Sequence, residues 1–174
     1  MALMADFDKV FEIGPVFRAE DSNTNRHLCE FTGLDMEMTI KEHYFEVLDT
    51  LADLLHHICD GLKTKYKTEL DIIKQQYPFE DFVCKYPVVK LHFKEGVAML
   101  KEAGVAQGDL EDLSTESEKA LGKLVKEKYE TDFYMLYGYP AAARPFYTML
   151  DPTDPNYTNS YDFFMRGEEI TSGA

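Results

Sequence analysis

Two runs of alternating residues, 16–20 and 31–38, constrain what this chain folds into more than any other feature, and a polar loop separates them. Successive side chains of a strand point to opposite faces. As strands, the two runs therefore have one apolar face and one face that presents a guanidinium, an aromatic ring and acids. The apolar set is Phe17, Ala19, Leu34, Met36 and Met38, and the other set is Val16, Arg18, Glu20, Phe31, Gly33, Asp35 and Glu37. We expect such a hairpin to pack its apolar face on a core and to hold a polar ligand on the other.

Composition places the chain among folded proteins of one domain or part of one. It has 174 residues, of which 45% are hydrophobic and 13% aromatic, which fits a packed globule and not a disordered chain. No apolar run approaches the roughly 18–20 residues of a membrane span, and the start does not read as a signal peptide. The three cysteines, Cys29, Cys59 and Cys84, are odd in number and widely spaced. They indicate a reducing compartment, the cytoplasm.

The charge balance by itself disfavours nucleic-acid binding. Eighteen basic residues stand against 32 acidic ones, which gives a net charge of −14. Affinity for a polyanion comes largely from neutralised phosphates. Local charge still matters more than the total, and Arg26 and His27 in the polar loop could meet a phosphate despite acidity elsewhere.

Periodicity predicts an α+β domain in which antiparallel strands are grouped with helices. Thr115 and Glu118 form a capping-box pattern at the start of one helix, Gly61 is expected near the end of another, and Gly104 closes a third. The predicted helices are 42–62, 68–76, 94–103 and 115–129; the predicted strands are 10–19, 31–40, 88–93, 133–137, 146–149 and 161–166.

The run from 10 to 38 closely resembles motif 2 of the class II aminoacyl-tRNA synthetases, in the aspartyl type of archaea and the eukaryotic cytosol. Three strings carry this resemblance in order and at the right spacing: Phe-Arg-Ala-Glu at 17–20, Asn-Arg-His at 25–27 and Glu-Phe-Thr-Gly-Leu-Asp-Met-Glu-Met at 30–38. Further stretches resemble the same family, so that nearly the whole chain is covered: 108–125, 131–134, 144–149 and 160–170.

The resemblance implies a partial catalytic domain, an antiparallel sheet flanked by helices. Its parts would be the motif 2 hairpin at 10–40, a helical insertion at about 42–129 and sheet strands at about 131–174. The family's anticodon-binding domain, motif 1 and motif 3 have no counterpart here. The expectation is therefore a fragment of a longer, homodimeric enzyme. The absent anticodon-binding domain would supply most of the grip on tRNA, which reconciles the acidic chain with a tRNA-handling role.

The implied activity is that of an aminoacyl-tRNA ligase working in translation. L-aspartate attacks the α-phosphate of ATP to give aspartyl adenylate, and the aspartyl group then passes to tRNA(Asp). Mg²⁺ would accompany ATP, and no membrane is involved. The first step needs charge neutralisation and in-line positioning more than a protein nucleophile.

The resemblance assigns roles to residues of the hairpin. Arg18 would be the catalytic arginine on the α-phosphate and the substrate carboxylate, where a planar charged fork matches phosphate oxygens. Phe31 would stack on adenine, and Asp35 would hold the substrate ammonium group. Glu20 and His27 would complete the ATP site, at adenine and at the terminal phosphates. In isolation, Arg18 would more often form a surface salt bridge with Glu20 or Glu37.

Other roles fall on the loop and on the end of the chain. Ser22 and Thr24 would contact the acceptor end of tRNA, although turn composition explains them equally well. Asp162 and Glu169 would hold Mg²⁺ against the triphosphate, with Glu169 also contacting ATP, and Ser172 would lie near aspartate. Seven residues apart on one regular strand, the two acids would face opposite sides, so Gly167 is expected to provide a bulge or a bend.

Two alternatives remain open. The first is asparaginyl-tRNA synthetase or an asparagine synthetase derived from the same fold, although the string from Thr32 to Glu37 favours the aspartyl type. A non-catalytic synthetase-like binding module is the second, against which the joint presence of Arg18, Phe31, Asp35 and the two late acids argues.

The isolated 174-residue chain is expected to be inactive, because the substrate-covering loop and motif 3 have no counterpart in it. Aspartate-dependent exchange of pyrophosphate into ATP should be undetectable for this chain alone. Robust exchange by the purified chain would refute this expectation.

Overall fold

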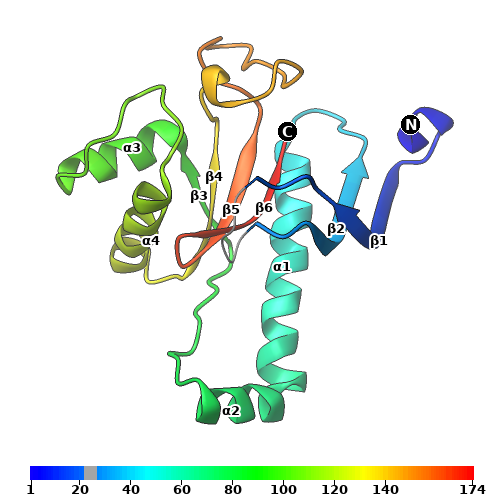
Figure 1. Ribbon diagram of the computed structural model, residues 1–174. Coiled ribbons are helices and arrows are strands. Elements are labelled where there is room, and N and C mark those ends of the chain that lie inside the picture. Colours follow the sequence, from blue (N-terminus) through cyan, green and yellow to red (C-terminus); the bar gives the residue numbers. More distant parts are fainter. Residues whose placement is uncertain (22–26) are drawn as a thin grey trace. The chain divides into compact units, whose positions relative to one another are not determined.

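The computed structural model describes residues 1–21 and 27–174, and divides them into two compact units, Met1–Val47 and Leu48–Ala174. Each unit has its own sheet (Figure 1). Helices and strands are both present, as the α+β prediction requires. Within the described residues, no helix has the length and apolar character needed to span a bilayer.

The first unit is built on a hairpin. After a short 3-10 helix, η1 (Ala2–Ala5), strand β1 (Lys9–Phe17) pairs antiparallel with β2 (Glu30–Met38), from Lys9 opposite Met38 to Phe17 opposite Glu30. Beyond the last pair, the Arg18 N–H donates to the Cys29 carbonyl at 2.9 Å. The two predicted strands are therefore confirmed, with ends shifted by one or two residues.

Pairing in register confirms the two unlike faces of the hairpin. Residues directly opposite each other in an antiparallel pair share a face. Val16 is opposite Phe31 and Glu12 is opposite Asp35, so ring and acids lie on one side. The other side is apolar, but its members Phe11, Ile13, Phe17 and Leu34 are exposed. The expected packing of this face on a core is thus not found within the described residues.

The second unit holds a four-stranded sheet in the order β3-β4-β5-β6. Its strands are β3 (Val89–His92), β4 (Phe133–Tyr137), β5 (Tyr161–Met165) and β6 (Glu168–Gly173). The last three are antiparallel as predicted, whereas β3 and β4 are parallel. The parallel pair is possible because α3 (Phe93–Glu102) and α4 (Thr115–Tyr129) form the crossover between them. The antiparallel prediction was therefore wrong for this pair, because residue alternation within a strand does not encode its direction.

Helices α1 (Phe45–Lys65) and α2 (Lys67–Gln76) precede this sheet (Figure 1). The predicted end near Gly61 was wrong by about a turn, because a glycine weakens a helix without ending it. The capping box at Thr115 was also misplaced: the Ser114 hydroxyl caps α4 by accepting from the Ser117 N–H at 3.1 Å.

The predicted strand at 146–149 does not exist. Pro145 has no N–H to donate to a ladder, and its carbonyl instead accepts from the Thr148 N–H at 3.0 Å in a turn. Phe146 is fully exposed there. An aromatic cluster in this stretch looked like a strand, but nothing in the described part of the chain pairs with it as one.

The main core lies between α3, α4 and one face of the second sheet. Tyr134 and Phe164 from neighbouring strands stack with ring centroids 5.3 Å apart, and β4 is buried along nearly its whole length. The core cluster consists of Leu91, Phe93, Val97, Leu100, Leu121, Val125, Tyr134, Leu136, Tyr139, Tyr157 and Phe164.

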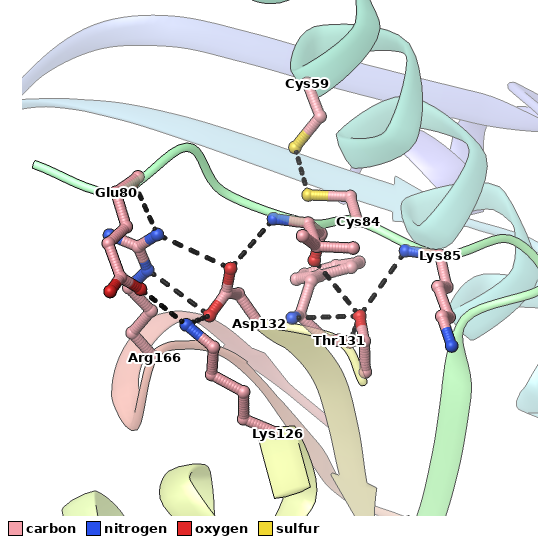
Figure 2. A network of polar contacts seen from close by, with 10 residues as sticks. Cys59, Glu80, Cys84, Lys85, Lys126, Thr131, Asp132 and Arg166 are labelled. Atoms are coloured by element: carbon pink, nitrogen blue, oxygen red, sulfur yellow. Dashed lines mark hydrogen bonds and ion pairs between the residues drawn. The ribbon is translucent and has the colours of Figure 1, made fainter. Parts of the chain in front are cut away.

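A buried aspartate ties three segments of this unit together (Figure 2). Asp132 Oδ2 accepts from the Val83 N–H at 2.8 Å, and Oδ1 lies 3.1 Å from Lys126 Nζ and 3.3 Å from Arg166 Nε. Burial acts to raise the pKa of Asp132, but the Val83 hydrogen bond and the two cations outweigh it and lower the pKa below its usual range. The carboxylate therefore stays charged and holds the segment before β3, the end of α4 and the β5–β6 turn.

Two glycines allow α4 to approach the β5–β6 turn. A Cβ on Gly122 would lie 2.6 Å from the Gly167 nitrogen and 2.7 Å from its Cα. Both of those atoms belong to the backbone, which cannot move as easily as the end of a side chain.

We expect Gly122→Ala to destabilise the chain by about 1–3 kcal/mol, because the overpacking outweighs the better helix propensity of alanine. Gly61→Ala is the matched control, since a Cβ there meets nothing within 4 Å and should stabilise α1 by up to about 1 kcal/mol. Urea unfolding of both variants measures the difference. Equal effects of the two changes would contradict the close contact.

Candidate active site

The polar face of the hairpin gathers Arg18 and Phe31 at one end. Arg18 lies two residues beyond Val16, the partner of Phe31, so strand alternation returns it to the same face. The Arg18 guanidinium lies over the Phe31 ring, 4.9 Å from its centroid. No ion pair joins Arg18 to Glu20 or Glu37 among the described residues, so the salt-bridge alternative is not realised there. The exposed guanidinium remains available to an anionic ligand.

The carboxylates of this face lie further along the strands. Asp35 is exposed, and Glu12 stands directly opposite it. Between the acids and the Phe31 ring, Gly14 pairs with Gly33, and the Val16 side chain lies over Gly33, where an added Cβ would be only 2.7 Å from Val16 Cγ2. Sequence patterns suggested only a distortion at Gly14. Its role as the partner of Gly33 depends on the register.

Two further predicted residues flank this face, and two cannot be placed. Glu20 is half-buried just beyond β1, and His27 is exposed before β2. Ser22 and Thr24, predicted to contact the tRNA acceptor end, lie outside the described residues.

In the second unit, Asp162 is a buried carboxylate held by an arginine. Arg144 Nη2 donates to Asp162 Oδ2 at 2.6 Å, and the Arg144 guanidinium lies 3.8 Å from the centroid of the Tyr139 ring. The other carboxylate oxygen, Oδ1, is buried without a hydrogen-bond partner in the described part of the chain. No periodicity in the sequence connects positions 144 and 162, so the positioning role of Arg144 was missed.

The β5–β6 hairpin settles the question of parity between Asp162 and Glu169. Arg166 and Gly167, with φ of 54° and 75°, form the two-residue turn. Glu169 then pairs with Phe164, which shares a face with Asp162. The expected bend at Gly167 is therefore a chain reversal that brings both acids to one face.

An irregularity in the same hairpin adds Ser172 to this face. Phe163 pairs with Thr171 while Phe164 pairs with Glu169, so Ile170 is an extra residue in β6. The resulting shift places Ser172, and not Thr171, opposite Asp162. Ser172 and Glu169 are both exposed.

The electrostatics of Asp162 differ from those of Asp132. Burial raises the pKa of Asp162 to about 6, and the charge of Glu169 acts in the same direction, while the Arg144 pair and a Tyr139 hydrogen bond oppose it. A bound cation near Asp162 would therefore reduce the electrostatic repulsion between Asp162 and Glu169.

The donor set fits a magnesium ion. Mg²⁺ prefers hard oxygen ligands, keeps several waters and usually takes only one or two carboxylates from the protein. Asp162 and Glu169 supply two such groups. No group of three or more possible metal-binding side chains occurs within the described residues.

The raised pKa of Asp162 predicts an unusual pH dependence of stability. Between pH 3.8, its ordinary pKa, and about pH 6, the Asp162 carboxyl binds more protons in the folded state than in the unfolded state. Its contribution to the free energy of unfolding therefore falls as pH rises. Without metal, the free energy of unfolding of the wild type minus that of Asp162→Asn should drop by about 2 kcal/mol from pH 4 to 7, at 1.36 kcal/mol per pKa unit.

Asp132→Asn is the matched control in the same unit. Because the pKa of Asp132 is lowered, its stabilisation is present above about pH 4 and is lost as pH falls through the folded pKa. The wild-type minus Asp132→Asn difference should therefore be flat between about pH 5 and 7. A flat curve for Asp162→Asn as well would show that Asp162 has an ordinary pKa.

Comparison with known proteins connects this geometry to a family. All 174 residues match the family of tRNA synthetases class II (D, K and N). The chain is 59% identical over 174 residues to the cytoplasmic aspartate–tRNA ligase of Bos taurus, of which it covers 35%. It therefore spans about a third of the length of this relative.

Solved structures agree in fold. The aspartyl-tRNA synthetase of Entamoeba histolytica aligns with a TM-score of 0.95 and 55% identity, over 99% of this chain and 36% of that one. The asparaginyl-tRNA synthetase of Pyrococcus horikoshii, complexed with asparaginyl-adenylate, aligns at 0.80 and 26% identity, over 97% and 37%. With its whole length matched, the chain belongs to the class II tRNA synthetases of the D, K and N group.

Proposed function

We propose that this chain is part of an aspartate–tRNA ligase, which activates L-aspartate with ATP and transfers it to tRNA(Asp) in the cytoplasm. The observation that carries the proposal is the register of β1 and β2, which sets Arg18, Phe31 and Asp35 on one face. Identity supports the aspartyl type, at 59% to the cytoplasmic Bos taurus ligase against 26% to the asparaginyl structure. The parent enzyme is proposed to be a homodimer, with 1–174 as part of its catalytic domain.

In the activation step, the carboxylate of aspartate attacks the α-phosphate of ATP and pyrophosphate leaves. Arg18 would neutralise charge on the α-phosphate oxygens, since a preorganised guanidinium stabilises charge that develops there. The Phe31 ring would stack on adenine, and the Asp35 carboxylate would pair with the substrate ammonium group. Glu20 and His27 would contact adenine and the terminal phosphates.

The second unit would bind the ion that accompanies the triphosphate. Asp162 and Glu169 would hold Mg²⁺, which when bound screens the negative charge of the phosphates. Arg144 fixes the orientation of Asp162, and Ser172 stands opposite it as a neutral hydroxyl near aspartate. In the transfer step, the terminal adenosine of tRNA attacks the adenylate carbonyl and AMP leaves. Ser22 and Thr24 are proposed to contact that acceptor end.

The test is a chimera in which residues 1–174 replace the matching segment of the Bos taurus ligase. We expect aspartate-dependent pyrophosphate exchange, and Arg18→Ala should lower kcat/KM about 100- to 1,000-fold, as loss of one stabilising donor does. Lys9→Ala removes a cation from the opposite face of the same strand and should change kcat/KM less than about two-fold.

The choice of amino acid separates the alternatives in this same assay. Exchange that depends on asparagine instead of aspartate would replace the proposal with the asparaginyl activity. A chimera that folds, by circular dichroism, and exchanges with neither amino acid would favour a non-catalytic binding module.

A further inference from the structure

Two cysteines that are distant in sequence meet in the second unit. Cys59 lies in α1 and Cys84 in the segment between α2 and β3, and their Sγ atoms are 2.9 Å apart (Figure 2). A disulfide bond is about 2.05 Å long, so the sulfurs need to approach by only about 0.9 Å. Both thiols are reduced here.

We propose that Cys59 and Cys84 are a redox-responsive dithiol, which a small-molecule disulfide such as oxidised glutathione converts into an intramolecular disulfide that fastens α1 to the segment before β3. Intracellular disulfides of this kind are usually transient and respond to redox conditions. The widely spaced cysteines gave no sign of pairing, because 25 residues separate these two.

The contact between α1 and this segment does not depend on the sulfurs alone. The Tyr86 hydroxyl donates to Asp53 at 2.8 Å on one side of the thiols, and Lys63 Nζ lies 4.8 Å from the centroid of the Phe82 ring on the other. Alternate residues 82, 84 and 86 of an extended segment thus meet α1 at 63, 59 and 53. The order of these contacts shows that the segment runs antiparallel to α1.

Both thiols are also held in place by backbone structure. Cys59 is well inside the 21-residue helix α1. Val83, next to Cys84, is fixed at both polar groups, because its N–H donates to Asp132 Oδ2 at 2.8 Å and its carbonyl accepts from the Asp132 N–H at 2.8 Å. Since neither sulfur can move far away, the second oxidation step is intramolecular and preorganised.

The chemistry balances with one molecule of oxidant. The Cys84 thiolate attacks one sulfur of the oxidant, which forms a mixed disulfide and releases one small thiolate. The Cys59 thiolate then attacks the Cys84 sulfur and releases the second. The two protein thiols lose two electrons and two protons, and the oxidant is reduced to two thiols.

The surroundings make the first step slow. Burial, the Cys59 thiol and the charge of Asp132 raise the pKa of Cys84 to about 12, although Lys63 opposes this shift. At pH 8 the thiolate fraction is then roughly 10⁻⁴, whereas a free thiol of pKa about 8.5 has roughly a quarter. Higher intrinsic nucleophilicity recovers only part of this, so we expect Cys84 to react roughly 10- to 100-fold more slowly than a free thiol.

The test uses the 174-residue chain with Cys29→Ser, which removes the exposed third thiol. After oxidised glutathione in native buffer at about pH 8, thiol titration and peptide mass mapping should show both thiols lost together, residue 59 linked to residue 84, and recovery with dithiothreitol. The closed loop should raise the thermal midpoint by roughly 5–15 °C. A raised midpoint shows that the disulfide is compatible with the folded state, whereas a lowered midpoint would show that it distorts the native structure.

Single variants are the matched controls. Cys59→Ser should stop at a glutathione adduct on Cys84, and Cys84→Ser should leave Cys59 unmodified because it is buried. Two retained thiols after prolonged oxidation, or two separate glutathione adducts on the folded Cys29→Ser chain, would overturn the proposal. Because no catalytic assay is involved, this result is independent of the proposed ligase function.

Discussion

Antiparallel pairing register is the constraint on which both candidate sites depend. A side chain's face is fixed by its partner across the ladder, and a slip by one residue would move every group to the opposite side. In the first unit, Val16 opposite Phe31 brings a ring to the face of Arg18, and Gly33 opposite Gly14 leaves room for the Val16 side chain on that face. In the second, the turn at Arg166 and Gly167 aligns Asp162 with Glu169, and one extra residue, Ile170, adds Ser172. Small irregularities of the ladder therefore select which polar groups act together.

Two buried aspartates of the second unit show how environment sets the state of the same side chain. Asp132 has two cations and a backbone N–H around it, and its pKa is lowered. Asp162 has a single arginine and a second acid nearby, and its pKa is raised to about 6. The first arrangement is complete by itself and fastens three segments. The second is a buried carboxylate whose pKa remains raised despite its arginine, and such under-compensated carboxylates are typical of functional sites.

The Asp132 cluster also explains why the segment before β3 has a defined path despite having little secondary structure. Hydrogen bonds between Asp132 and Val83 hold Cys84 against α1. There the Cys84 Sγ atom lies 2.9 Å from the Cys59 Sγ atom. The same anchoring contacts that stabilise the start of β4 thus create a pair of thiols in position to react. The short distance between the sulfurs favours a disulfide. Burial raises the pKa of Cys84, so the rate of thiol oxidation is low.

Local sequence alone determined the period-two faces of the hairpin and the helices over 68–76, 94–103 and 115–129, since these depend on alternation, propensity and stop signals within a few residues. The resemblance of the motif strings also placed Arg18, Phe31, Asp35, Asp162 and Glu169 in a family before any coordinates. Tertiary structure decided the rest: the parallel direction of β3 and β4, the turn where a strand was expected at 146–149, the arginine on Asp162 and the meeting of Cys59 with Cys84. These features join residues tens of positions apart, and the free energy of such contacts comes from burial and charge pairing that no local pattern encodes.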